Sequence, residues 1–222
     1  MKTILRVLFF KFTKEDCLKF TRSDFLLGLL ITWIVGIGRY WDNPKANLAQ
    51  HLGVGSMVYI FLLSFFVWII VYPIRKADWK YFQVLTFIAM VSLPAILYAV
   101  PVERFMDLQA ARSVNVWFLS LVALWRVVLL FLFLKRYAQL TAPETLIATL
   151  LPLTVIVSLL TALNLEHVVF NIMAGNSETS ATANDSAYYF LILLTTTSIF
   201  LLPILLIGYG VLIYRTRAAR TK

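Results

Sequence analysis

Long apolar stretches separated by short polar connections dominate the pattern along the chain. Six of them stand out, at residues 25–40, 53–71, 82–100, 114–134, 146–163 and 188–213. Most approach the roughly 20 residues that a helix needs to cross about 30 Å of hydrocarbon. The short first stretch is compatible with a locally thinned bilayer, and the long last one with a tilted helix. The pattern therefore predicts an all-α integral membrane protein, with a bundle of about six transmembrane helices over residues 25–214.

The segment before the first stretch, residues 1–24, has a different character. It begins like a secretion signal, but Arg6 and Lys11 interrupt its apolar run and no small-residue cleavage site follows. Apolar residues spaced for one helical face stand beside these cations, namely Ile4, Leu5, Leu8, Phe9 and Phe12. This arrangement predicts a short amphipathic helix that lies on the surface of the membrane.

A small repeat also falls in this segment. The sequence FTKED at residues 12–16 recurs as FTRSD at residues 20–24. In each copy an Asp follows a Thr by three residues, which is a weak form of the capping box because Asp is shorter than the usual Glu. The repeat therefore predicts two consecutive helix starts, after Thr13 and after Thr21.

The distribution of positive charge predicts the orientation. Of the 20 Lys and Arg residues, 15 fall before the first stretch, in alternate connections and after the last stretch, and only four fall on the opposite side. The positive-inside rule then places both termini in the cytoplasm, with residues 215–222 as a basic tail. Because the net charge of +9 is clustered at the ends of apolar runs, it indicates topology and not a nucleic-acid partner. Short connections favour the inner membrane of a bacterium, as a multi-pass protein.

Arg126 is the remaining cation, and it lies inside the fourth apolar stretch. It is about eight residues from the cytoplasmic end, or roughly 12 Å deep, where a cation normally faces protein or water. No stretch offers a carboxylate at that depth. The predicted acceptors are Ser64, Thr154 and the carbonyl of Met90, which Pro94 deprives of its helical donor. Arg126 then either ties helices together or contacts an anion or a lipid phosphate.

A second candidate site lies on the predicted external face. Both histidines, His51 and His167, fall there together with Glu103 and Glu166. Such residues could act as acid and base on a lipid headgroup, or His51, Glu166 and His167 could bind a zinc-like metal. No HExxH, CxxC or similarly spaced motif links them, so these are weak candidates for a catalytic or metal site.

Three functions remain open from the sequence. The first is a small transport, channel-like or accessory membrane component that handles an anionic or amphiphilic species, with no cofactor and no enzymatic activity of its own. The second is a membrane-embedded enzyme built on the external His and Glu residues. The third is an assembly or scaffold factor that binds another membrane protein, or its own copies, through the glycines of GIG at 36–38, GVG at 53–55 and GYG at 208–210. Nucleotide-binding and nucleophile-elbow signatures are absent from the sequence.

Overall fold

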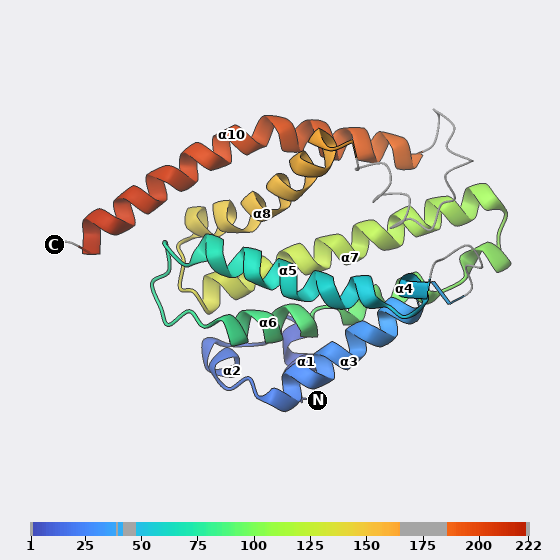
Figure 1. Ribbon diagram of the computed structural model, residues 1–222, viewed down its shortest axis with the longest axis horizontal. Coiled ribbons are helices and arrows are strands. Elements are labelled where there is room, and N and C mark those ends of the chain that lie inside the picture. Colours follow the sequence, from blue (N-terminus) through green and yellow to red (C-terminus); the bar gives the residue numbers. More distant parts are fainter. Residues whose placement is uncertain (1, 39, 42–47, 165–185, 221–222) are drawn as a thin grey trace. The chain divides into compact units, whose positions relative to one another are not determined.

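The computed structural model describes residues 2–38, 40–41, 48–164 and 186–220, and over these residues the chain is helical and contains no strand (Figure 1). Five of the described helical segments are long and apolar enough to cross a membrane: Val54–Val71, Tyr81–Ala99, Ser113–Arg136, Ala142–Ala162 and Leu191–Ala219. The prediction of an all-α, multi-pass membrane protein is confirmed at this level.

The helices follow the predicted stretches closely. In chain order they are α1 Lys2–Leu8, α2 Lys14–Leu18, α3 Arg22–Gly38, α4 Leu48–His51, α5 Val54–Val71, α6 Tyr81–Met90, the 3₁₀ helices η1 Leu93–Ala99 and η2 Val102–Arg104, then α7 Leu108–Arg136, α8 Ala142–Ala162 and α10 Ser186–Arg220. The first predicted stretch corresponds to α3, whose 17 residues extend about 26 Å at 1.5 Å per residue. This is slightly less than the hydrocarbon thickness, so a sixth span remains a prediction.

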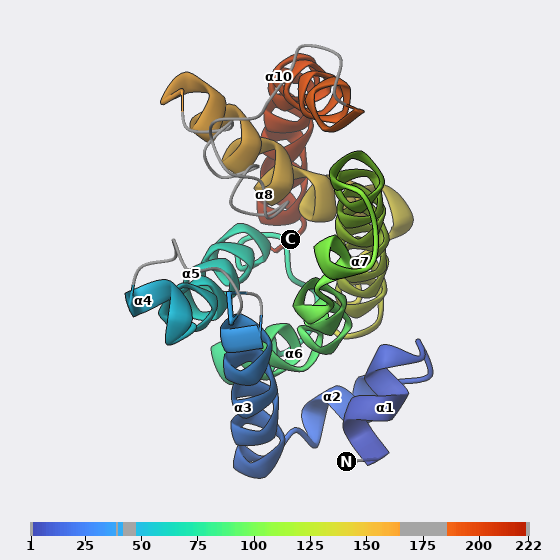
Figure 2. The same ribbon diagram turned by 90° about the vertical axis from the view of Figure 1, so that its right-hand side faces the viewer.

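The chain divides into two compact units, which are described separately. The first comprises residues 1–100 and 122–146, and the second comprises residues 101–121 and 147–222. In the first unit α3, α5 and α6 pack against one another, and α1 and α2 lie against α6 (Figure 2). In the second unit the side chain of Ile147 on α8 packs at 3.1 Å from the position that a Cβ on Gly208 of α10 would take.

The span Tyr81–Ala99 is interrupted where Pro94 breaks the helical hydrogen bonding. α6 ends at Met90, and the chain continues as η1, with Pro94 in its first turn. Proline has no N–H and its ring clashes with the preceding turn, so an α-helix cannot continue through it undisturbed. The hydroxyl of Thr32 on α3 donates to the carbonyl oxygen of Ala89 at 3.3 Å, close to this break. The break therefore lies at a helix crossing inside the first unit.

Both predicted helix starts in the N-terminal segment are confirmed. The Asp16 carboxylate accepts from the Thr13 backbone N–H at 2.8 Å, and the Thr13 hydroxyl accepts from the Asp16 N–H at 3.3 Å. Asp24 and Thr21 repeat this pair of bonds at 3.0 and 3.2 Å. Each Asp therefore reaches back to its cap despite its short side chain, and two helices begin within ten residues of each other.

α1 is shorter than the predicted amphipathic helix and buries part of its apolar face in protein. It ends at Leu8. Ile4 and Leu8 are buried, whereas Leu5 and Phe9 are exposed. Only the exposed residues remain available to a bilayer surface, so a position on that surface stays a prediction.

Candidate functional site

Arg126 lies on α7 with its guanidinium group half-buried and weakly bonded. Its Nη2 donates to the Ser92 hydroxyl at 3.3 Å, between α6 and η1, and its Cζ lies 5.6 Å from the ring centroid of Tyr59 on α5. Within the described ranges no carboxylate forms an ion pair with it. A guanidinium carries five N–H donors, so most of its capacity to bind an acceptor is unused by those parts of the protein.

The other two predicted members of this site have different surroundings. The Ser64 hydroxyl on α5 is fully buried and has no hydrogen-bond partner in the described part of the chain. The Thr154 hydroxyl on α8 donates within its own helix, to the carbonyls of Leu150 and Leu151 at 3.1 and 3.0 Å. The hydrogen-bond partner that sequence reasoning missed is Ser92. It stands two residues before Pro94, at the break that had been expected to expose the Met90 carbonyl.

The candidate site on the predicted external face falls largely outside the described residues. Glu166 and His167 lie in the undescribed range 165–185. His51 ends the short helix α4, and Glu103 belongs to η2, where only its backbone is described. Across the residues that are described, no group of three His, Cys, Asp or Glu side chains could hold a metal ion. The catalytic and metal predictions therefore stay predictions.

A third site, which the sequence did not predict, is built where the N-terminal segment packs on the end of α7. Phe12 is buried with its ring 6.0 Å from that of Phe87 on α6, and Phe87 stacks on Phe133 of α7 at 4.0 Å. The indole N–H of Trp125 on α7 donates to the Leu8 carbonyl at 3.1 Å. Burial of aromatic rings dominates the energetics of such contacts, so these residues fasten the segment to the first unit.

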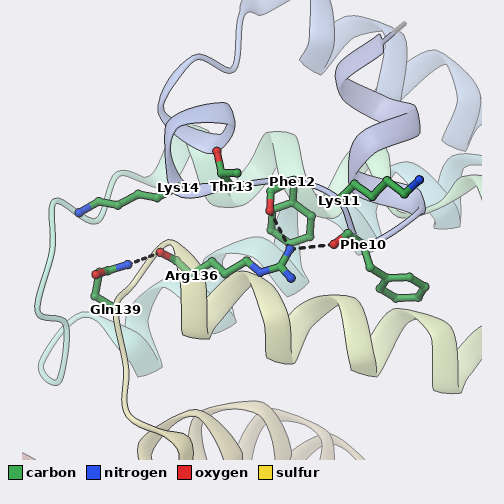
Figure 3. A pocket seen from close by; sticks show the side chains of 7 residues that line it. All are labelled: Phe10, Lys11, Phe12, Thr13, Lys14, Arg136 and Gln139. Carbon is green, nitrogen blue, oxygen red and sulfur yellow. Dashed lines mark hydrogen bonds between the residues drawn. The ribbon is translucent and has the colours of Figure 1, made fainter.

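Arg136, the last residue of α7, binds the chain between α1 and α2. Its Nη1 donates to the carbonyl oxygens of Phe10 at 2.8 Å and Phe12 at 2.7 Å, and its Cζ lies 4.9 Å from the ring centroid of Phe12. Figure 3 shows the guanidinium below this link, with both bonds drawn. The sequence had counted Arg136 only as one of the charges that set topology, because nothing local to it indicates a partner more than 120 residues away.

A hollow of about 430 Å³ opens at this junction. Its lining residues come from the link between the two short helices and from the end of α7, and they are Phe10, Lys11, Phe12, Thr13, Lys14, Arg136 and Gln139. Three of them are cations and none is acidic. Of the two carboxylates that follow Lys14 in the sequence, Glu15 does not line the hollow. Asp16 is already bonded to Arg6 at 2.7 Å and to the cap of α2. The hollow is therefore positively charged.

The reactivity of the Cys17 thiol shows whether the N-terminal segment is packed at this junction. The residue is completely buried in α2, and burial raises the pKa of its thiol to about 12, with the nearby Asp16 carboxylate adding to the effect. The thiolate is the reactive form of cysteine, so a pKa of about 12 leaves only about one thiol in ten thousand ionised at pH 8. Cys17 is thus an unreactive thiol for as long as the N-terminal segment stays packed.

We expect a maleimide reagent to label Cys17 at least about a hundredfold more slowly in the folded protein than in denaturant, since both access and ionisation oppose the reaction. The chain has one cysteine, so labelling followed by mass spectrometry reads this site alone. Lys19→Cys in a Cys17→Ser background is the control, because position 19 is exposed and should label rapidly. Fast labelling of Cys17 in the folded protein would show that the segment does not stay packed.

Comparison of the sequence with models of known protein families gives no match, and neither the curated proteins nor the solved structures give one. A functional conclusion must therefore be argued from the chemistry of these sites.

Proposed function

We propose that this protein is a small component of a bacterial inner membrane that handles an anionic or amphiphilic species, in a transport, channel-like or accessory role, through Arg126. In this proposal α3 crosses the membrane in addition to the five long apolar helical segments, which gives six spans, and both termini lie in the cytoplasm. The protein works without a cofactor and without catalysis of its own.

The observation that carries the proposal is the unbalanced charge of Arg126. A cation within a spanning helix is expensive unless an acceptor, water or an anion neutralises it. The described surroundings supply one hydroxyl at 3.3 Å and one aromatic face at 5.6 Å. Guanidinium groups bind carboxylate and phosphate with two parallel hydrogen bonds, so an amphiphile with an anionic head would supply what the described surroundings lack.

Ser64 supports the same proposal from a neighbouring helix of the first unit. A buried hydroxyl without a partner is destabilising by about 1–3 kcal/mol. Native structures contain few such groups, and each calls for an explanation. In a protein that binds an amphiphile, a polar headgroup or an accompanying water molecule can supply the missing acceptor or donor.

The test compares Arg126→Leu with Arg126→Lys in the full-length protein. We expect both to insert and fold, and Arg126→Leu to weaken binding of oleate about tenfold or more, since a hydrogen-bonded charge contributes about 1.5–3 kcal/mol. Arg126→Lys keeps the charge and should lose less. Oleyl alcohol, which lacks the carboxylate, is the matched uncharged ligand and should not distinguish the variants.

The yield of folded protein distinguishes ligand binding by Arg126 from a purely structural role. If Arg126 only ties helices together, Arg126→Leu should lose folded protein, and Ser92→Ala, which removes its hydrogen-bond partner, should lose part of it too. Equal yield of all variants with equal oleate binding would contradict both the proposed function and the tie.

A further inference from the structure

We propose that the hollow between the α1–α2 link and the end of α7 is a binding site for a phosphate group, as carried by the headgroup of an anionic phospholipid. This site is separate from Arg126 and does not depend on the function proposed for that residue. Its walls are residues 10–14 together with Arg136 and Gln139.

The donors suited to phosphate come from two segments that are distant in sequence. Arg136 spends one nitrogen, Nη1, on two carbonyls, which leaves the N–H groups of Nη2 and Nε without a partner in the described residues. Figure 3 shows Lys11 and Lys14 extending from the link in opposite directions, with their ammonium groups directed away from this guanidinium. Lysine is a flexible point charge, whereas arginine presents a fixed fork that matches phosphate oxygens. Both lysine side chains are flexible, so their ammonium groups can turn toward a phosphate that the fixed guanidinium holds.

The backbone of the link is held in an unusual conformation. Phe10 has φ +61°, a left-handed value that a bulky residue rarely adopts. It occupies the position after α1 where glycine is usual, since the Lys11 N–H bonds to the Arg6 carbonyl at 2.8 Å and the Phe10 N–H to the Val7 carbonyl at 3.1 Å. Its ring stacks on Trp125 at a centroid distance of 5.5 Å.

This conformation has a consequence for the site. It directs the Phe10 carbonyl at Arg136 and fixes the guanidinium before any ligand arrives. Strained residues that persist often belong to binding sites, where the strain is part of a pre-organised geometry. A pre-organised arginine loses little freedom when it binds an anion.

The location fits a lipid better than a freely diffusing anion. The described span Ser113–Arg136 ends at Arg136, so the hollow lies at the level of the headgroups. Leu5 and Phe9, on the same segment, are 47% and 60% exposed and apolar, which suits contact with acyl chains. By the charge distribution this side faces the cytoplasm, where anionic lipids attract basic segments by about 1 kcal/mol for each Lys or Arg.

The experiment uses the full-length protein in detergent and reads protection of Cys17 from maleimide, because the thiol lies in the helix that follows the link. Dihexanoyl phosphatidylglycerol, dihexanoyl phosphatidylcholine and inorganic phosphate are each added in separate titrations, and their effects are compared. We expect phosphatidylglycerol to slow labelling of Cys17 at saturation, and phosphatidylcholine, whose choline cation offsets the charge of its phosphate, to have little effect. Protection by inorganic phosphate as well would show that the phosphate group alone is recognised, whereas protection by phosphatidylglycerol alone would identify a lipid as the ligand.

Two double variants of equal net charge test whether phosphatidylglycerol binds in the hollow. Lys11→Gln with Lys14→Gln should weaken phosphatidylglycerol binding about tenfold or more, from two cations near an anionic headgroup. Lys19→Gln with Lys135→Gln removes two exposed lysines of the same segment and the same helix end that do not line the hollow, and it should leave binding within about twofold.

Three results would overturn the site: no protection by either anion, equal protection by phosphatidylcholine, or equal weakening in the two double variants. Arg126→Leu should bind phosphatidylglycerol in this assay as the unaltered chain does. The experiment can therefore contradict the phosphate site while the function proposed for Arg126 stands, and the oleate experiment can contradict that function while the phosphate site stands.

Discussion

Phe87→Ala is expected to destabilise the folded protein by about 3–5 kcal/mol, the usual range for removing a buried phenylalanine ring. Phe87 is fully buried on α6, stacks on Phe133 at 4.0 Å and contacts Phe12 at 6.0 Å between ring centroids. The change opens a cavity at the place where the N-terminal segment meets α6 and α7. That segment depends on such tertiary contacts, because α1 and α2 comprise only seven and five residues.

The measurement is a thermal melt in detergent with a thiol-reactive dye, since exposure of Cys17 reports the release of this segment. The apparent melting temperature should fall, and labelling of Cys17 should accelerate at temperatures below global unfolding. Phe200→Ala on α10 is the matched control, because this ring is 71% exposed and surface changes usually stay within about 0.5 kcal/mol. A melt of Phe87→Ala that coincides with that of Phe200→Ala would rule out the packing described for the segment.

The helical architecture was predictable because it depends on local properties. Runs of about 20 apolar residues determine the spans. A Thr and an Asp three residues apart determine the helix starts after Thr13 and Thr21. The break near Pro94 follows from the proline itself. The boundaries of α5 and α8 lie within a few residues of the predicted stretches. These features need no knowledge of which helices meet.

The sites were less predictable because they depend on which helices meet. Arg126 was recognised from its depth, but its hydrogen-bond partner was not, since several hydroxyl groups lie at similar depths in the sequence. The hollow was not predicted at all. It joins Arg136 to a link more than 120 residues earlier, and the only local sign of it was a basic pair at the end of a span, which topology explains equally well.

The glycines illustrate the same limit. Within the motifs GIG, GVG and GYG, Gly36 and Gly53 pack against each other, with 3.2 Å between the Cα of Gly53 and the position that a Cβ on Gly36 would take. Gly55 and Gly210 of the same motifs face open space, with no atom within 4 Å of the Cβ position. Gly28, which belongs to no such motif, makes an equally close approach, because a Cβ on it would lie 3.0 Å from backbone atoms of α6. Small residues permit close packing, but only the partner helix decides which of them is used.

Gly28→Leu is therefore expected to separate α3 from α6 and to cause a large loss of folded protein. A Cβ at this position would lie 3.0 Å from the carbonyl carbon of Ala89 and 3.0 Å from the nitrogen of Met90. Both are backbone atoms, which cannot rotate away as a flexible side chain does. Overpacking of this kind costs about 1–3 kcal/mol, and more where the backbone must move.

The crossing also carries the hydrogen bond from Thr32 to the Ala89 carbonyl at 3.3 Å, and separation of the helices breaks it. Gly28→Ala adds only the Cβ and should reduce the yield of monodisperse protein less than Gly28→Leu does. Gly55→Leu introduces the same side chain into a spanning helix where no atom lies within 4 Å, so it should retain nearly full yield. If Gly55→Leu and Gly28→Leu lose equal amounts of protein, added bulk or lipid contact is responsible, and the contact between α3 and α6 is not the determinant.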